Sequence, residues 1–133
     1  MNERNYSKLK VLIIDDQPFL RSIIKRLLQQ LGFNMIEEAE DGASGIEAHN
    51  RQLPDLIICD IEMEPVDGLV FLQTLREDKD TKKSDAKVIF LTQHADSDIV
   101  TKAQALKVDA FVIKPPSFDK LRDRVAYVLS DVK

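Results

Sequence analysis

Acidic residues follow two short apolar runs of this sequence, and they are the first candidates for chemistry. Asp15 and Asp16 come directly after the run at residues 10–14, and Asp60 comes directly after the run at 56–59. Uninterrupted apolar runs of this length are typical of strands buried on both faces of a parallel sheet. Ligands bind such sheets at the carboxyl ends of the strands. We therefore expect the three carboxylates to lie at one edge, where a site could form.

Two more polar residues follow later apolar runs. Thr92 comes after the run at 87–91, and Lys114 comes after the run at 109–113. Converging carboxylates repel one another, which raises the pKa of one of them unless a cation shares the site. Mg²⁺, which prefers oxygen ligands and retains several waters, suits a partly open acidic crevice. A lysine can hold an anion beside a carboxylate, and a threonine hydroxyl can donate to a phosphoryl oxygen.

Together these residue types indicate a site that stabilises a phosphoryl group during transfer. The expected acceptor is a carboxylate, because no serine or cysteine nucleophile with a neighbouring base is evident. Taken singly, each residue has an ordinary alternative: Asp15 and Asp16 could cap a helix, and Thr92 and Lys114 could belong to plain loops. Their shared position after successive strands makes chance convergence a minor alternative.

Composition limits the remaining classes of function. The 133 residues suffice for one domain with a substantial core, and the net charge of −4 without a basic block argues against direct binding of nucleic acid. One cysteine and two histidines exclude an internal disulfide and disfavour a zinc site. No signal segment is evident and no apolar run approaches the about 20 residues of a membrane span, so we expect a soluble cytoplasmic protein.

Strand-like runs alternate with helix-like periodicity along the chain. Strands are predicted at 10–14, 34–38, 56–59, 87–91 and 109–113, and helices at 18–31, 43–52, 66–77, 96–107 and onward from the capping residue Ser117. This alternation predicts an α/β fold, a parallel sheet with helices on both faces. Residues 1–9 are expected to be a tether, 10–131 the domain, and 78–85 a solvated loop. His49 is expected to be exposed and Cys59 to be a small buried hydrophobe.

The sequence resembles the receiver domain of two-component response regulators, the chemotaxis regulators among them, from about residue 10 to residue 130. The resemblance is carried by the following stretches: Val11-Leu-Ile-Ile-Asp15-Asp16, Asp55-Leu-Ile-Ile-Cys-Asp60, Asp67-Gly68, Phe90-Leu-Thr92 and Asp109-Ala-Phe-Val-Ile-Lys114-Pro115. It implies a flavodoxin-like doubly wound (βα)5 fold with strand order 2-1-3-4-5.

The same resemblance implies roles for individual residues. Asp60 would accept a phosphoryl group from a histidine kinase or a phosphotransfer protein. Mg²⁺ would be held by Asp15, Asp16, Asp60 and the backbone carbonyl of Glu62. Lys114 would pair with Asp60 and then with the phosphoryl group, and the Lys114–Pro115 peptide bond would be cis. The protein would be a phospho-acceptor that promotes its own phosphorylation and dephosphorylation rather than an enzyme.

The resemblance also implies a switch. Thr92 would move to the phosphoryl group, and Phe111 would turn into the space vacated. The output surface for a protein partner would be formed by residues 96–107, 109–113 and the last helix, and a homodimer is a further possibility. No direct contact with nucleic acid or with a membrane is implied.

The sequence departs from the family pattern near the acceptor. Pro65 stands one position later than usual, which predicts an altered loop path of unchanged length. Gln93 is larger than the usual residue and is expected to restrict access to the phosphoryl group, unless it points into solvent. Glu62 and His94 occupy positions that modulate dephosphorylation in the family. We expect them to form a charge-paired lid, the alternative being two solvated side chains that never meet.

Three other readings remain. A pseudo-receiver, which binds partners without phosphorylation, is opposed by the complete set of Asp15, Asp16, Asp60, Thr92 and Lys114. A phosphatase of the haloacid dehalogenase type would need a second aspartate at position 17, where the chain has Gln17. A flavin-binding protein would need a phosphate-binding loop in place of the acidic pair. The partner kinase, the output pathway and the presence of further domains are not specified by these residues.

Overall fold

The chain folds around one parallel sheet, described here from a computed structural model over residues 5–93 and 96–131, without the side chains of Thr81 and Lys82. Five strands pair in the order β2-β1-β3-β4-β5, which confirms the expected order. The strands are β1 (Lys10–Ile14), β2 (Met35–Ala39), β3 (Leu56–Asp60), β4 (Lys87–Thr92) and β5 (Ala110–Ile113). Every residue of β3 is buried, as a central parallel strand requires.

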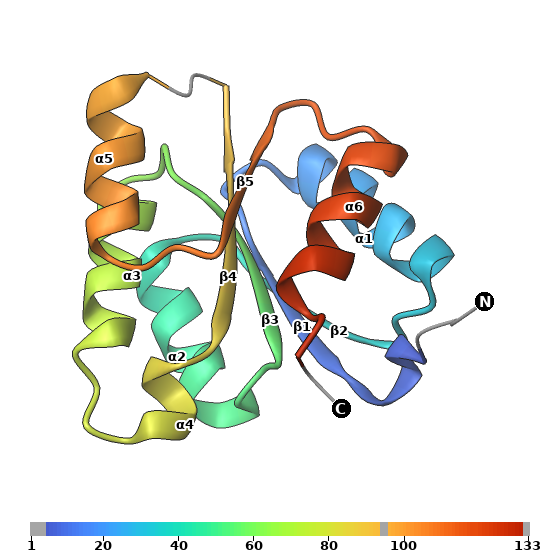
Figure 1. Ribbon diagram of the computed structural model, residues 1–133, viewed down its shortest axis with the longest axis horizontal. Coiled ribbons are helices and arrows are strands. Elements are labelled where there is room, and N and C mark those ends of the chain that lie inside the picture. Colours follow the sequence, from blue (N-terminus) through green and yellow to red (C-terminus); the bar gives the residue numbers. More distant parts are fainter. Residues whose placement is uncertain (1–4, 94–95, 132–133) are drawn as a thin grey trace.

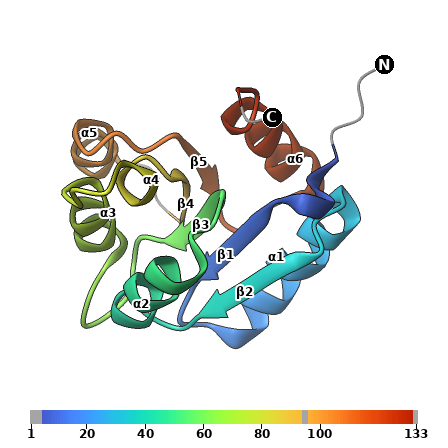
Figure 2. The same cartoon turned by 90° about the horizontal axis from the view of Figure 1, so that it is seen from below.

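Helices cover both faces of the sheet (Figures 1 and 2). The helices are α1 (Pro18–Leu31), α2 (Gly42–Gln52), α3 (Gly68–Arg76), α4 (Thr81–Ser84), α5 (Ser97–Ala105) and α6 (Phe118–Val128), preceded by the 3₁₀ turn η1 (Tyr6–Lys8). Alternate residues of the strands face opposite sides, so Ile13 and Ile58 pack under α1 and α6, while Leu12 and Ile57 pack under α2, α3 and α5. None of the described helices has the length and apolar character needed to cross a bilayer.

Local sequence signals start and stop the helices much as expected. Gly32 ends α1 in the left-handed conformation at φ 111°, and the side chains of Asp67, Asp96 and Ser117 each accept a backbone N–H in the first turn of α3, α5 and α6. Predicted boundaries differ from the observed ones by up to two residues. The confirmed pattern leaves the loops after β1, β3, β4 and β5 at one edge of the sheet.

Three expectations about the periphery were wrong. The proposed tether is folded at its end, because Tyr6 is only 8% exposed and stacks on Phe33 with ring centroids 4.6 Å apart; residues 1–4 lie outside the described part. The loop expected at 78–85 contains the short helix α4. His49 is 2% exposed, and its Nε2 lies 3.1 Å from the carbonyl oxygen of Lys83, so this nitrogen carries the proton that is donated.

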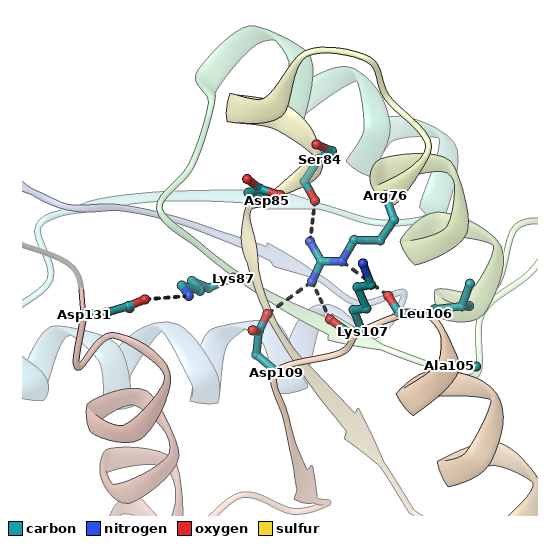
Figure 3. Close-up of a pocket in the computed structure, with 9 residues that line it drawn as sticks. All are labelled: Arg76, Ser84, Asp85, Lys87, Ala105, Leu106, Lys107, Asp109 and Asp131. Atoms are coloured by element: carbon teal, nitrogen blue, oxygen red, sulfur yellow. Dashed lines mark hydrogen bonds and ion pairs between the residues drawn. The ribbon is translucent and has the colours of Figure 1, made fainter.

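Arg76, at the end of α3, ties several elements together at the amino edge of the sheet (Figure 3). Its guanidinium donates to four backbone carbonyls, those of Ser84, Ala86, Leu106 and Lys107. It also pairs with Asp109 Oδ2 at 3.2 Å, and the same oxygen accepts the N–H of Val88 at 2.7 Å. One cation therefore fixes the starts of β4 and β5 and the end of α5, beside a cavity of about 580 Å³.

Replacing Arg76 with lysine is expected to destabilise the fold. Lysine offers a point charge without the planar fork of donors, so several inward-facing carbonyls lose their partner, at a cost of about 1–3 kcal/mol. Urea unfolding measures this change in the free energy of unfolding. Arg26→Lys, on an exposed position of α1, is the matched control and should stay within about 0.5 kcal/mol of wild type. Equal midpoints for the two variants would contradict the role assigned to Arg76.

Candidate functional site

The three predicted carboxylates meet at the carboxyl edge of the sheet. Asp15 and Asp16 follow β1, Asp60 ends β3, and each offers one oxygen within 4.8 Å of the others. The strand register explains this, because Ile14 is paired with Cys59, so that the residues after both lie at one level. Asp15 and Asp60 are buried at 0% and 1% exposure, whereas Asp16 is exposed. The cluster is thus a buried acidic pair with a third acid at its mouth.

Lys114 enters this cluster from the end of β5. Its Nζ lies 2.8 Å from Asp60 Oδ1 and 3.5 Å from Asp15 Oδ2, and its side chain is 8% exposed. The pairing of Thr92 with Ile113 carries the chain to this point, and the Lys114–Pro115 peptide bond is cis, as expected. A second cis bond, Glu64–Pro65, lies in the loop after β3. One ammonium therefore faces two buried carboxylates.

Burial and charge shift the protonation of all three groups. Burial raises the pKa of Asp60 to about 6, with Asp15 adding to the rise and Lys114 opposing it. Burial also raises the pKa of Asp15, against the N–H of Gln17 that donates to its Oδ1 at 2.8 Å. For Lys114, burial disfavours the ammonium, but the hydrogen bond to Asp60 and the charges of both aspartates outweigh it and raise the pKa. The acid cluster lacks positive charge, since one lysine serves two carboxylates.

The backbone around Asp60 is tightly packed. A Cβ on Gly68 would lie 2.6 Å from the carbonyl oxygen of Asp60 and 2.8 Å from the Cα of Ile61, so only glycine fits at the start of α3. The N–H of Glu62 donates to Asp60 Oδ1 at 3.2 Å. Met63 in the same loop is 4% exposed. These contacts fix the Asp60 carboxylate from its own loop as well as from Lys114. Cys59 is buried, as predicted, and its thiol donates to the carbonyl oxygen of Asp60.

Thr92 ends β4 on the other side of Asp60 and is fully buried. Its Oγ1 donates to Glu62 Oε2 at 3.0 Å, and the N–H of Gln93 lies 3.5 Å from Glu62 Oε1. Glu62 therefore contacts the predicted switch threonine. Its expected partner, His94, lies outside the described residues. Gln93 itself is exposed, and its effect on access to Asp60 stays a prediction.

Phe111 lies on β5, away from the acid cluster. It is partly buried, and its ring centroid is 6.1 Å from that of Phe90. With Val108, Arg124 and Tyr127 it borders a hollow of about 390 Å³ between β5, α5 and α6. Phe111 is therefore packed against the core on one side and borders this hollow on the other.

The donor set fits a hard divalent cation. Asp15 Oδ2 is buried and has no hydrogen-bond donor among the residues that the structure describes, only the ion pair with Lys114. Within the described ranges, the carboxylates of Asp15, Asp16 and Asp60 form the one acidic group close enough to share an ion. Oxygen-only ligands at a partly open edge suit Mg²⁺, which retains water in such sites.

One contact at this site was missed from the sequence. Arg21, one turn into α1, donates from its guanidinium to the carbonyl oxygen of Asp15 and pairs with Glu38 at 3.0 Å. It thereby connects the acidic loop to the end of β2. In the sequence, Arg21 is only a basic residue in the first turn of the helix that follows Asp15 and Asp16. The side chain of such a residue is usually solvated, so the contact could not be predicted.

The raised pKa of Asp60 predicts how stability changes with pH in the absence of metal. The folded-state pKa of about 6 exceeds the ordinary value of 3.8 for an aspartate in the unfolded chain, so the folded state holds this proton more tightly. The stabilisation is complete below pH 4 and disappears as the pH rises through 6. Relative to Asp60→Asn, wild type should lose up to about 3 kcal/mol between pH 3.5 and 7.

Urea unfolding of both proteins across this range in a chelator measures the difference. Asp98→Asn, at an exposed position of α5, is the matched control for the loss of one carboxylate. A difference between wild type and Asp60→Asn that does not change with pH would contradict the assigned environment of Asp60.

Comparison with known proteins assigns this geometry to a family. A family model described as the response regulator receiver domain matches residues 11–126. The chain is 36% identical over 126 residues to a probable chemotaxis protein CheY of Rhizobium etli, covering 95% of this chain and 96% of that protein. It is 29% identical over 121 residues to the chemotaxis protein CheY of Bacillus subtilis, covering 91% and 98%.

Solved structures agree with the sequence relatives. The signal receiver domain of a signal transduction histidine kinase from Syntrophus aciditrophicus matches with a TM-score of 0.83 at 29% identity, covering 94% of this chain and 92% of that one. The chemotaxis protein CheY4 of Vibrio cholerae matches with a TM-score of 0.84 at 24% identity over 91% and 98%, a likeness of fold. With its matched model, its near full-length relatives and its acidic site, this chain belongs to the response regulator receiver domain family.

Proposed function

We propose that this receiver domain is a phosphorylation switch in which Asp60 accepts a phosphoryl group from a histidine kinase or a phosphotransfer protein. The proposal depends on one observation above all. The buried Asp60 lies 2.8 Å from Lys114 and within 4.8 Å of the carboxylates of Asp15 and Asp16. An acceptor oxygen, a counter-cation and a metal donor set thus occupy one edge of the sheet.

Each residue of the site would have its own role in phosphoryl transfer. A carboxylate oxygen of Asp60 forms the new bond to phosphorus as the bond to the donor nitrogen breaks. The Lys114 ammonium, already paired with Asp60, is close enough to pair with a phosphoryl oxygen at the same position. Asp15, Asp16, Asp60 and the carbonyl of Glu62 would hold Mg²⁺. When bound, this ion supplies positive charge that the phosphoryl oxygens need.

The response to phosphorylation would be a shift between two arrangements. Thr92 would turn its hydroxyl to the phosphoryl group, and Phe111 would turn inward. The output surface proposed for a protein partner or for a second copy of the chain is the face of α5, β5 and α6. The hollow beside Phe111 supports this choice, because it is a depression on this face that a partner side chain can enter. We further propose a cytoplasmic location, a signalling rather than an enzymatic role, and restricted access to Asp60 because of Gln93.

Beryllofluoride with Mg²⁺ tests the proposal, because it forms a stable mimic of a phosphoryl group on a carboxylate. Wild type should show chemical-shift changes in ¹H–¹⁵N NMR spectra at Thr92, Phe111 and Lys114, and Asp60→Asn should show none of them. Asp98→Asn is the matched control and should respond like wild type. The absence of a response that depends on Asp60 would favour a pseudo-receiver that binds partners without phosphorylation.

A further inference from the structure

Both carboxylate oxygens of Glu62 contact residues at the end of β4. Oε2 accepts the Thr92 hydroxyl at 3.0 Å, and Oε1 lies 3.5 Å from the N–H of Gln93. Thr92 is fully buried and Glu62 is exposed, so the carboxylate reaches in from the mouth of the site. One flexible side chain thus contacts the hydroxyl that the proposed switch must move.

The same residue also contacts the proposed acceptor. The N–H of Glu62 donates to Asp60 Oδ1 at 3.2 Å, two residues away along the chain. Its backbone is therefore fixed beside Asp60, and its side chain spans from there to Thr92. Glu62 thus links the loop after β3 to the end of β4, beside the backbone hydrogen bond from the N–H of Ile61 to the carbonyl oxygen of Leu91.

A threonine hydroxyl has a single proton to donate. While Thr92 Oγ1 donates to Glu62, it cannot donate to an oxygen bound at Asp60. Two acceptors then compete for one donor, the Glu62 carboxylate in the resting protein and a phosphoryl oxygen in the modified one. Both acceptors are anionic, so the hydrogen bond to Glu62 is charge-assisted and must be broken before Thr92 can donate to a phosphoryl oxygen.

We propose that Glu62 is a positioning residue that holds the Thr92 hydroxyl in the resting arrangement and so opposes activation. This Glu62–Thr92 latch rests on the proposed function for its consequence, since the competing acceptor is a phosphoryl group on Asp60. A contact made in only one of two states shifts their equilibrium by its own free energy. Breaking the latch should therefore tighten the binding of a phosphoryl mimic and slow the loss of the phosphoryl group.

Glu62 could also act through its charge alone, because a carboxylate near a phosphoryl group repels it. A double-mutant cycle separates the two effects. If Glu62 acts through Thr92, its removal has little effect once the hydroxyl is gone. If it acts by repulsion, the effect of removing Glu62 is the same with and without the hydroxyl.

The cycle uses wild type, Glu62→Ala, Thr92→Ala and the double variant, each titrated with beryllofluoride at saturating Mg²⁺. We expect Glu62→Ala to tighten binding about 3- to 10-fold when Thr92 is present, and less than about 2-fold in the Thr92→Ala background. Glu62→Gln keeps an oxygen acceptor and should give a smaller change than Glu62→Ala. Glu64→Ala removes an exposed carboxylate from the same loop and should bind like wild type. Equal effects in both backgrounds, or no tightening, would overturn the latch.

A second measurement tests the latch in the resting protein, without metal or mimic. Three-bond NMR couplings report the χ1 rotamer of Thr92, and Glu62→Ala should redistribute it while Glu64→Ala leaves it unchanged. An unchanged rotamer in Glu62→Ala would overturn the latch even if Asp60 binds beryllofluoride. Conversely, a redistributed rotamer with no Asp60-dependent binding in wild type would support the latch and refute the proposed function.

Discussion

The buried contact between Lys114 and Asp60, 2.8 Å long, is the interaction on which the site depends. It joins the end of β5 to the end of β3 across the intervening β4, so it depends on the order β3-β4-β5 within the sheet. Asp15, also buried and 3.5 Å from the same ammonium, leaves the cluster short of positive charge. Burial raises the pKa of Asp60 and Asp15 adds to the rise, while the shortage of positive charge explains the fit to a divalent cation. A fold that concentrates carboxylates at such cost retains them for binding or chemistry.

The amino and carboxyl edges of the sheet differ in the contacts that they contain. At the amino edge, Arg76 joins α3, β4, α5 and β5 through backbone carbonyls and Asp109, which favours a fixed base. At the carboxyl edge, Thr92 and Phe111 lie beside a replaceable hydrogen bond and a hollow. The amino edge thus holds contacts that fix the elements, and the carboxyl edge holds the contacts that the proposed switch would change.

The sequence predicted the strands and the five residues of the site because both follow from strong rules. Apolar runs mark buried parallel strands, and the residues after them share one edge. The burial of His49 and the contacts of Arg76 were not predicted, because their partners are mainly backbone carbonyls in other segments of the chain. Composition and periodicity do not reveal such contacts. Tyr6 was missed for a related reason, since its stacking on Phe33 joins segments that local sequence does not connect. The direction of the Glu62 side chain likewise depends on tertiary geometry.

The central claim, that Asp60 is the phosphoryl acceptor, is tested most directly by locating the modified residue. Wild type is incubated with Mg²⁺ and acetyl phosphate, and borohydride then reduces the aspartyl phosphate to homoserine, which peptide mass spectrometry assigns to one position. We expect homoserine at position 60, dependent on Mg²⁺ and absent from Asp60→Asn. Homoserine at position 15 or 16, or none at any position in wild type, would contradict it.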